Sequence, residues 1–273
     1  MDIICWNVAG IRSLIKKGAL DFLIDSKFDV LCLQETKALE SQVDIPLELK
    51  ERFPYRYWGE NHGLTQRKGL SGTAIWSRIK PLRHLSTPDF DTEGRITALE
   101  FRDFYLVTVY TPNSQGPRTE RMTYRVNIWD QLFRDYIESL NSLKPTIVCG
   151  DFNVAHQNID IYNPIKYKNS IAGFLDVERN NFTTHLYKFV DIYRELYPDK
   201  IQYTYWDQIR PHMRANNKGW RIDYFLIPKN YTHMIYDSLI HDWISGSDHC
   251  PISLTLKKNS SLKIIDVLEQ SSN

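Results

Sequence analysis

The chain has 273 residues, of which 42% are hydrophobic and 13% aromatic, and its formal net charge is +1. Its longest apolar runs are only as long as a β-strand, far short of the roughly 18 residues that a membrane-spanning helix needs, so the composition excludes a membrane-spanning protein. A charge this close to zero neither favours nor excludes a nucleic acid partner, and the distribution of the basic residues must decide that question.

Eight short apolar segments, taken in chain order, are typical of β-strands. They cover residues 3–6, 30–33, 72–76, 96–101, 105–110, 146–149, 222–227 and 252–256. A short helical pattern covers roughly residues 11–24. The clearest helix follows Pro117, a favourable first-turn residue, because apolar residues there repeat at helical spacing and make one stripe: Met122, Val126, Trp129, Phe133, Tyr136, Ile137 and Leu140.

No repeat, low-complexity tract or flexible linker divides these segments. We therefore expect one domain over residues 1–256, followed by a polar C-terminal tail over residues 257–273 that contains one loosely docked helical turn at most. Many short strands with interspersed helices predict packed sheets flanked by helices.

The four cysteines are far apart in the chain and form no paired motif. We interpret them as buried free thiols of a reducing compartment: Cys5, Cys32, Cys149 and Cys250. The chain also starts without the basic and apolar regions of a signal peptide. Both features predict a cytoplasmic protein, associated with the nucleoid if its source is bacterial.

The polar residues at the ends of the predicted strands form the most informative pattern. Six strand ends offer amide, carboxylate, phenol and imidazole groups: Asn7, Glu35, Tyr110, Asp151 with Asn153, Asp223, and Asp248 with His249. Functional sites of sheet folds gather at such ends, where rigid strands direct side chains into loops. Taken singly, each residue is more often a solvated side chain or a turn former. Together they suit a hard divalent cation, a phosphate group and a proton shuttle.

Six sequence strings, in this order, resemble the exonuclease III and abasic-site endonuclease family over about residues 1–256. They are WNVAGIR (6–12), LCLQETK (31–37), VYTPN (109–113), CGDFNVAH (149–156), GWRIDY (219–224) and GSDHCP (246–251). The Gln-Glu, Gly-Asp-x-Asn and Ser-Asp-His elements recur across the wider DNase I-like phosphodiesterases, so they bear on the chemistry and not on the substrate. The Trp-Arg-Ile-Asp-Tyr and Glu-Thr-Lys strings are narrower and indicate the DNA repair branch.

The resemblance implies a four-layer α/β sandwich, in which two mixed β-sheets pack face to face with helices outside. It also implies metal-dependent hydrolysis of DNA, with incision 5′ to abasic sites that leaves 3′-OH ends, and with 3′-phosphodiesterase and 3′–5′ exonuclease activity. The substrate would be double-stranded DNA that carries abasic sites or blocked 3′ ends. We expect the protein to act as a monomer.

By the same resemblance, Glu35 is the first choice as a ligand for Mg²⁺, for which Mn²⁺ can substitute, with one or two ions bound. Four further residues would supply oxygen atoms to the metal site: Asn7, Asp151, Asn153 and Asp248.

The resemblance assigns the proton and phosphate chemistry as well. Asp151 would act on the nucleophilic water or on the leaving oxygen, and Asn153 would orient it. His249 would donate a hydrogen bond to a phosphate oxygen, with Asp223 fixing the imidazole tautomer. Two residues would bind the phosphate from the opposite side: Tyr110 and Asn113.

Substrate choice rests on other residues. Three resemble the family's apolar pocket for a base-free sugar, which a nucleotide carrying its base does not fit: Tyr205, Trp220 and Ile222. Ordinary packing in an aromatic core is the alternative for Trp220. Contacts to DNA without sequence specificity are predicted for Arg12, Lys37, Arg67, Lys68, Arg95, Arg118, Arg214 and Asn217.

Two segments depart from the family pattern. Many relatives have an arginine within about three residues of the position of Asn113, whereas here the next arginine is Arg118. The segment between Trp206 and Trp220 is also one residue longer than usual. By the resemblance, these departures bear on product release, lesion grip and the balance between exonuclease and endonuclease activity, and not on the chemistry.

Three alternative functions remain at this stage. They are the same metal chemistry on a sphingomyelin or inositol phosphate, a secreted nuclease like DNase I, and a catalytically inactive DNA-binding or scaffold protein. The narrow repair-branch strings and the absence of an amphipathic membrane-binding stretch disfavour the first, and the missing signal peptide disfavours the second. An inactive protein would be expected to lack one of Glu35, Asp151, Asp223 and His249, and all four are present.

Overall fold

The computed structural model describes residues 1–59, 71–207 and 212–257. Within them, the strands are β1 (Asp2–Asn7), β2 (Val30–Gln34), β3 (Tyr55–Trp58), β4 (Thr73–Ser77), β5 (Arg83–His84), β6 (Ile96–Glu100), β7 (Tyr105–Tyr110), β8 (Thr146–Asp151), β9 (Phe189–Asp191), β10 (Asp223–Pro228), β11 (Ile235–Ile240) and β12 (Ile252–Leu256). The α-helices are α1 (Ile11–Lys16), α2 (Leu47–Arg52), α3 (Glu120–Tyr124), α4 (Asp130–Leu143), α5 (Pro164–Tyr167), α6 (Asp176–His185), α7 (Ile192–Leu196) and α8 (His212–Ala215).

The strands form two mixed six-stranded sheets. The first has the order β11-β12-β1-β2-β4-β3 and the second β5-β6-β7-β8-β10-β9. In the first sheet β1 and β2 are parallel, in the second β7 and β8 are parallel, and the other pairs are antiparallel. The first strand of the chain therefore lies in the same sheet as the last described strand.

The core lies between the two sheets, because alternate residues of each central strand point to opposite faces. Ile3 and Cys5 of β1 pack with Ile147 and Cys149 of β8 in one buried cluster, to which strands of both sheets contribute. The residues between them face outward: Ile4 and Trp6 pack beneath α1 and α2, in a separate cluster. Central strands are thus apolar on both faces, as expected for sheets that are covered on both sides.

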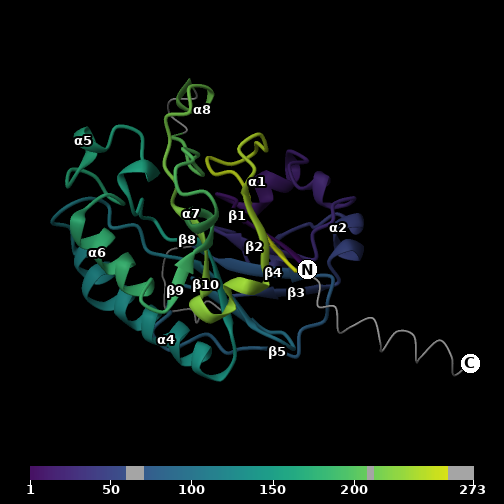
Figure 1. Cartoon of the computed structure of the whole chain (residues 1–273). Helices are drawn as coiled ribbons and strands as arrows, with labels where there is room; N and C mark the ends of the chain where they lie inside the picture. The colour runs from purple at the N-terminus through teal and green to yellow at the C-terminus, as the bar shows by residue number, and fades with distance from the viewer. Residues whose placement is uncertain (60–70, 208–211, 258–273) are drawn as a thin grey trace, which may run out of the picture.

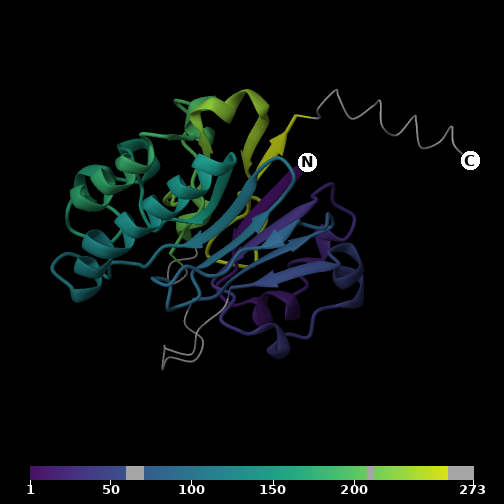
Figure 2. The same cartoon turned by 90° about the horizontal axis from the view of Figure 1, so that it is seen from below.

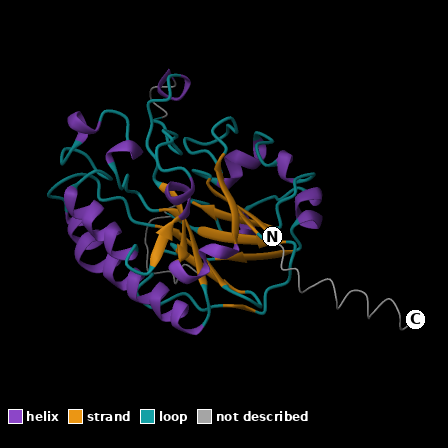
Figure 3. Ribbon diagram, viewed as in Figure 1, coloured by secondary structure: helices purple, strands orange, loops and turns teal. Residues whose placement is uncertain are grey.

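The helices cover the outer faces of the sheets. Val107 and Val148 of the second sheet pack against Trp129, Phe133, Ile137 and Phe182 of the segments that include α4 and α6. Figures 1 and 3 show the resulting layers, with α4 and α6 on one side, α1 and α2 on the other and the strands between them. Seen from below in Figure 2, the teal and green helices again lie apart from the purple ones. The predicted four-layer α/β sandwich is confirmed.

All eight predicted strands are present, and each is a central strand of its sheet. The four strands that the apolar pattern missed are β3, β5, β9 and β11, the edge strands. An edge strand pairs on one side only and is less completely covered, so it does not need a continuous apolar run. The predicted helical pattern over residues 11–24 forms only α1 and a 3₁₀ turn over Asp21–Leu23.

The predicted helix after Pro117 is present but interrupted. α3 leads into a π-helical turn over Arg125–Trp129, and α4 follows. Trp129, Phe133 and Ile137 of the predicted stripe are buried. The π turn shifts the phase of the helix, and it also turns Arg125 inward, so that this side chain is only 2% exposed.

Two smaller predictions can be compared with the structure. All four cysteines are buried and free, as predicted. In the described part of the chain, every helix is too short or too polar to cross a bilayer. The predicted helical turn of the C-terminal tail lies outside the described residues.

Candidate active site

The pairing of the strands brings the predicted polar residues to one end of the two sheets. In the second sheet, Asp151 at the end of β8 lies opposite Tyr110 of β7 on one side and opposite Asp223 of β10 on the other. In the first sheet, Asn7 at the end of β1 pairs with Gln34, and Glu35 follows directly. The ends of β1, β2, β7 and β8 and the start of β10 therefore meet at the same place.

Asn7 connects the two sheets at this point. Its side-chain Nδ2 donates to Glu35 Oε1 and to Asp151 Oδ2, at 2.9 Å in each case. The Asn7 carbonyl oxygen accepts a hydrogen bond from Ser247 Oγ at 2.8 Å, and its side-chain oxygen accepts one from the Ala9 backbone. A fully buried amide with these partners fixes the separation of the two carboxylates, one from each sheet.

Sharp backbone turns follow the strands at this end of the molecule. Ala9, Glu35, Lys37 and Asn153 have positive φ angles of 47°, 50°, 51° and 49°. Residues other than glycine rarely adopt this left-handed conformation, and such residues cluster at functional sites, where the surrounding structure compensates for the strain. The turns direct the side chains of Glu35 and Asn153 toward the junction of the sheets.

His249 and Asp223 form a buried pair behind Asp151. Nδ1 of His249 lies 2.8 Å from Asp223 Oδ2, and the same oxygen accepts a hydrogen bond from Thr204 Oγ1 at 2.5 Å. Burial of His249 opposes its charged form, but the Asp223 carboxylate outweighs burial and raises the pKa of His249 to about 10. The imidazole is therefore protonated at neutral pH, and its Nε2 faces Asp151 Oδ2 at 3.8 Å.

Asp151 is a buried carboxylate in a negative environment. Burial, together with the charges of Asp223 and Glu35, raises its pKa to about 7, although His249 acts in the opposite direction. Its Oδ1 accepts a hydrogen bond from the Asn153 backbone at 2.8 Å. A carboxyl group with such a pKa exists in both protonation states at neutral pH and can accept or donate a proton.

The donor set fits a divalent metal ion. Ligand atoms of Glu35, Asp151 and His249 lie within 4.8 Å of one another. For Glu35, burial works against ionisation, but hydrogen bonds from Lys37 and Asn7 prevail and lower its pKa. The Lys37 ammonium group lies 2.7 Å from Glu35 Oε2, so a cation already neutralises this carboxylate. Asp248 lines the same pocket, with its Oδ1 bound by Ser247 Oγ at 3.1 Å.

The predicted phosphate-binding residues Asn113 and Tyr110 line the same pocket as His249. Asn113 Nδ2 donates to Asn153 Oδ1 at 2.9 Å, and Asn153 Nδ2 donates to the Thr111 carbonyl oxygen at 2.8 Å. Tyr110 is hydrogen-bonded to Glu35, and burial together with the nearby carboxylates raises its pKa well above the ordinary value. The Tyr110 hydroxyl is thus a proton donor over the whole physiological pH range.

These residues line one pocket of 440 Å³, to which apolar and aromatic side chains contribute as well as acidic and amide groups; the apolar and aromatic members are called its apolar wall. The predicted pocket residues Tyr205, Trp220 and Ile222 all belong to it, together with Tyr167 and Ile171, which the sequence analysis did not identify. Trp206, omitted from the predicted pocket, is 3% exposed and packs in the core between the sheets.

The predicted DNA-binding residues are in different environments. Arg12, Arg118 and Asn217 are exposed, and Lys37 pairs with Glu35. Arg67 and Lys68 lie outside the described residues. DNA contacts by all of these remain predictions.

Two of the predicted DNA-binding arginines have internal partners. Arg95 is 3% exposed, binds Glu93 and the Tyr110 carbonyl oxygen, and stacks on the Tyr110 ring. Arg214 donates to the carbonyl oxygens of Ser247, Asp242 and Ile244. These contacts give both arginines a supporting role for the residues that carry the site, in addition to any contact with DNA.

Sequence reasoning missed two residues that hold the catalytic loop, which we define as residues 151–156. Arg125 donates to the carbonyl oxygens of Phe152 at 2.7 Å and Pro112 at 3.3 Å. The Tyr224 hydroxyl donates to the Val154 carbonyl oxygen at 2.7 Å. A charged residue within an apolar helical stripe was the available signal for Arg125, since an arginine on a buried helix face needs internal partners.

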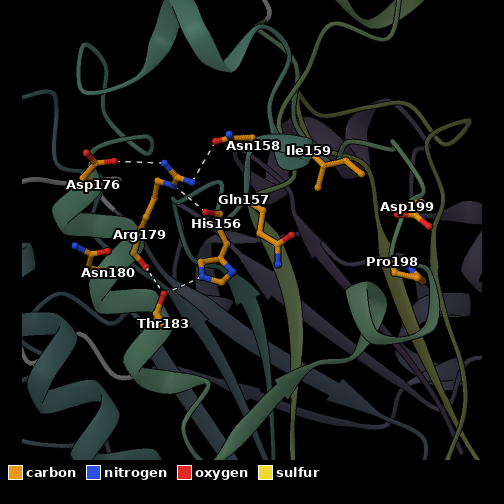
Figure 4. Close-up of a pocket in the computed structure, with 10 residues that line it drawn as sticks. All are labelled: His156, Gln157, Asn158, Ile159, Asp176, Arg179, Asn180, Thr183, Pro198 and Asp199. Atoms are coloured by element: carbon orange, nitrogen blue, oxygen red, sulfur yellow. Dashed lines mark hydrogen bonds and ion pairs between the residues drawn. The ribbon is translucent and has the colours of Figure 1, made fainter.

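A second pocket, of 560 Å³, lies beyond the end of the catalytic loop (Figure 4). Arg179 of α6 donates to the His156 carbonyl oxygen at 2.8 Å and to Asn158 Oδ1 at 3.2 Å, and His156 Nε2 lies 2.9 Å from Thr183 Oγ1. The residues that line this pocket include none of the predicted site residues. The polar residues that line this pocket bind one another, and their hydrogen bonds connect the end of the catalytic loop to α6.

Comparison with known proteins agrees with this site. Residues 4–249 match the Endonuclease/Exonuclease/phosphatase family. Over 261 residues, the chain is 41% identical to the DNA repair nuclease APEX1 of Danio rerio, and the alignment covers 94% of this chain and 82% of that protein. It is also 41% identical, over 261 residues, to the exodeoxyribonuclease of Bacillus subtilis (strain 168), with 94% of this chain and 99% of that protein covered.

Among solved structures, an AP endonuclease from Archaeoglobus fulgidus has the same fold, with a TM-score of 0.83 at 24% identity, covering 94% of this chain and 100% of that one. The resemblance noted in the sequence is confirmed. The chain belongs to the Endonuclease/Exonuclease/phosphatase family and, within it, to the branch that includes this exodeoxyribonuclease and APEX1.

Proposed function

We propose that this protein is a metal-dependent DNA repair nuclease that hydrolyses the phosphodiester bond 5′ to an abasic site and also trims 3′ ends. One observation carries the proposal: a protonated histidine, its buried aspartate partner and two further carboxylates converge at one pocket that apolar side chains also line. Such a pocket offers groups for phosphate hydrolysis next to a surface suited to a sugar without a base.

The activation barrier of the reaction indicates how much proton transfer and electrostatic stabilisation must each contribute to catalysis. Hydrolysis of a phosphodiester requires acceleration worth on the order of 20 kcal/mol. Proton transfer by a general acid or base contributes only about 10²–10⁴-fold, so electrostatic stabilisation must supply most of the remainder. Glu35 is the proposed main ligand of Mg²⁺, with Asp151 and Asn7 beside it and Asp248 and Asn153 at the edge of the same site, whereas the protonated His249 would face the phosphate. The bound cation would supply charge stabilisation of the phosphate and help to position it.

The protein's own groups supply the proton chemistry. Water attacks the phosphorus atom, the bond from phosphorus to the 3′ oxygen breaks, and the products are a 3′-OH and a 5′-phosphate. Asp151, with a pKa of about 7, takes the proton from the water or gives one to the leaving oxygen. His249, held protonated by Asp223, donates from Nε2 to a phosphate oxygen as negative charge develops there.

Amide and phenol donors complete the phosphate site. Asn113 and Tyr110 line the same pocket as His249, and all three would donate to the phosphate. Asn153 connects Asn113 to the Asp151 carboxylate because it binds both residues. Fixed donors of this kind stabilise developing charge without reorganising during the reaction.

Cleavage of three labelled substrates tests the proposal: a duplex with one abasic analogue, the same duplex without the lesion, and a duplex with a 3′-phosphate end. We expect incision 5′ to the lesion with Mg²⁺ present and none with EDTA. Degradation from 3′ ends alone would retain the nuclease chemistry and contradict the preference for abasic sites. Cleavage of phospholipids or inositol phosphates, but of no DNA, would overturn the proposal.

A further inference from the structure

The apolar wall of the pocket contains two residues that no motif predicts. Tyr167 at the end of α5 and Ile171, four residues later, line the pocket with Tyr205, Trp220 and Ile222. The ring of Tyr167 lies 6.2 Å from that of Trp220, at an interplanar angle of 40°. Tyr167 and Ile171 therefore extend the predicted pocket by a segment from a different part of the chain, residues 164–173.

This segment is fixed against the catalytic loop. The backbone N–H of Ala155 donates to the Gly173 carbonyl oxygen at 2.9 Å, and Phe174 is completely buried beside Ile222. Gly173 has a φ of +80°, and a Cβ there would lie 3.1 Å from both the Asn153 carbonyl oxygen and the Trp220 ring. Only glycine permits this close approach without strain, so the segment is held directly against the residues of the site.

The segment also closes upon itself. The backbone N–H of Asn169 donates to the Phe174 carbonyl oxygen at 3.1 Å, and the Asn169 side chain exchanges two hydrogen bonds of 2.7 Å with Asp176. Tyr167 and Ile171 are thus carried by a loop with internal bonds at its base. A rigid carrier of this kind allows side chains to discriminate between ligands by shape.

The exposed part of the wall is apolar although it faces water. Tyr167, Ile171, Tyr205 and Trp220 are only partly buried, and they pack on the buried cluster of Ala155, Ile161, Phe174 and Ile222. Asp151 and His249 line the same pocket, and the ring of Tyr205 lies 4.9 Å from that of His249. A substrate that reaches Asp151 and His249 with its phosphate will cover the wall with the attached sugar, which removes apolar surface from water.

We propose that Tyr167 and Ile171 are specificity-determining residues that contact the flipped, base-free deoxyribose and close the pocket to a nucleotide that carries its base. The inference rests on the proposed function and adds the residues that set the preference for abasic DNA. The volume of 440 Å³ must accommodate the phosphate as well as the sugar, and it lies near the lower end of the range of about 300–1,000 Å³ for small-molecule sites.

Binding in EDTA tests this inference independently of cleavage. Tyr167→Ala and Ile171→Ala are compared with wild type on an abasic duplex and on the same duplex without the lesion, by fluorescence anisotropy. Ile165→Ala is the matched control, because Ile165 is 93% exposed in the same segment. We expect each pocket variant to bind abasic DNA about ten-fold more weakly, the effect of a few lost apolar contacts, with undamaged DNA and the control unchanged.

Cleavage provides the second measurement. With Mg²⁺, the ratio of kcat/KM for abasic incision to kcat/KM for 3′–5′ degradation should fall about ten-fold in both pocket variants and stay constant in Ile165→Ala. Equal losses on both substrates would identify a merely structural role and overturn the inference, as would unchanged binding and unchanged ratios. Failure of wild type to cut any DNA would instead refute the proposed function, while the binding preference would still decide the role of these two residues.

Discussion

The guanidinium group of Arg125 holds the backbone of Asn153 from within the protein, with Nη1 lying 2.7 Å from the Asn153 carbonyl oxygen. Asn153 is in the left-handed conformation, and its side chain connects Asn113 to Asp151. Because Arg125 also binds the Pro112 carbonyl oxygen, one buried cation holds the backbone on both sides of the Asn113–Asn153 hydrogen bond.

Arg125→Met should therefore damage both stability and activity. It would leave the buried carboxylates of Glu178 and Asp130, at 3.5 and 3.7 Å, without their cation, which costs about 3–5 kcal/mol in the free energy of unfolding. Arg125→Lys should retain part of this free energy but lower kcat, since an ammonium group cannot bind three carbonyl oxygens in the same geometry. Urea denaturation and steady-state kinetics measure the two effects.

Arg134→Met is the control for Arg125, because Arg134 lies in the following helix α4 with its side chain 27% exposed. We expect it to change stability by less than about 0.5 kcal/mol. An Arg125→Met protein with wild-type stability and wild-type kcat would contradict the positioning role.

The pH dependence should report the His249–Asp223 pair. Asp223→Asn removes the largest charge that raises the pKa of His249 against burial, so this pKa should fall, although Asp151 and Asp248 still raise it. Activity at pH 7.5 should fall at least about 100-fold, and the basic limb of the pH–rate profile should move from near pH 10 to lower pH. A profile with an unmoved basic limb would show that His249 is not the titrating group.

Stability should follow the same linkage. The folded pKa of His249, about 10, exceeds its unfolded value, so its contribution is complete below about pH 6.5 and is lost as the pH rises through 10. The free energy of unfolding of wild type should accordingly decline between these pH values relative to that of Asp223→Asn. Urea denaturation at intervals of one pH unit measures this difference.

Lys37 should weaken metal binding, because its ammonium group lies on the Glu35 carboxylate. Lys37→Met should tighten Mg²⁺ binding several-fold, since removal of a partly exposed charge at this distance is worth on the order of 1 kcal/mol. Glu35→Gln should abolish it. Calorimetric titration without DNA separates this effect from any contact of Lys37 with the substrate, and weaker Mg²⁺ binding by Lys37→Met would contradict the account.

Gly150 illustrates how closely the catalytic strand packs. A Cβ at this position, where φ is +144°, would lie 1.9 Å from the Val109 carbonyl oxygen of the neighbouring strand. Gly150→Ala should therefore cost more than about 3 kcal/mol in the free energy of unfolding. Gly116→Ala, with a φ of +115° and no atom within 4 Å of the added Cβ, should cost only about 1–2 kcal/mol. Equal losses for both variants in urea denaturation would show that contact with Val109 is unimportant.

The sequence predicted the central part of the fold but not its borders. All eight predicted strands are central, where burial on both faces requires a continuous apolar run, whereas β3, β5, β9 and β11 are edges with weaker patterns. The residues of the catalytic cluster could be predicted because the ends of the strands can be recognised from such apolar runs. Asp151 and Asp223 are neighbours through strand pairing, a relationship between distant segments that no local pattern contains.

Other parts of the site depend on tertiary contacts. Arg95 and Arg214 look like surface charges in the sequence, yet their guanidinium groups bind carbonyl oxygens of other segments. Tyr167 and Ile171 belong to no motif, and they line the pocket only because Gly173 permits their segment to approach Trp220. The left-handed conformation of Glu35 is likewise a result of its surroundings, since its residue type does not favour it.

The most direct test of the central claim is incision of an abasic duplex by Asp151→Asn in the presence of Mg²⁺. Asp199→Asn, which changes a carboxylate of the second pocket, is the control. The account predicts a loss of at least about 10³-fold in kcat/KM for Asp151→Asn. The variant should also be at least as stable as wild type at pH 8, because an amide removes the cost of ionising a buried group whose pKa is raised to about 7. A stable Asp151→Asn protein that retains incision within three-fold of wild type, while Asp199→Asn behaves alike, would contradict it.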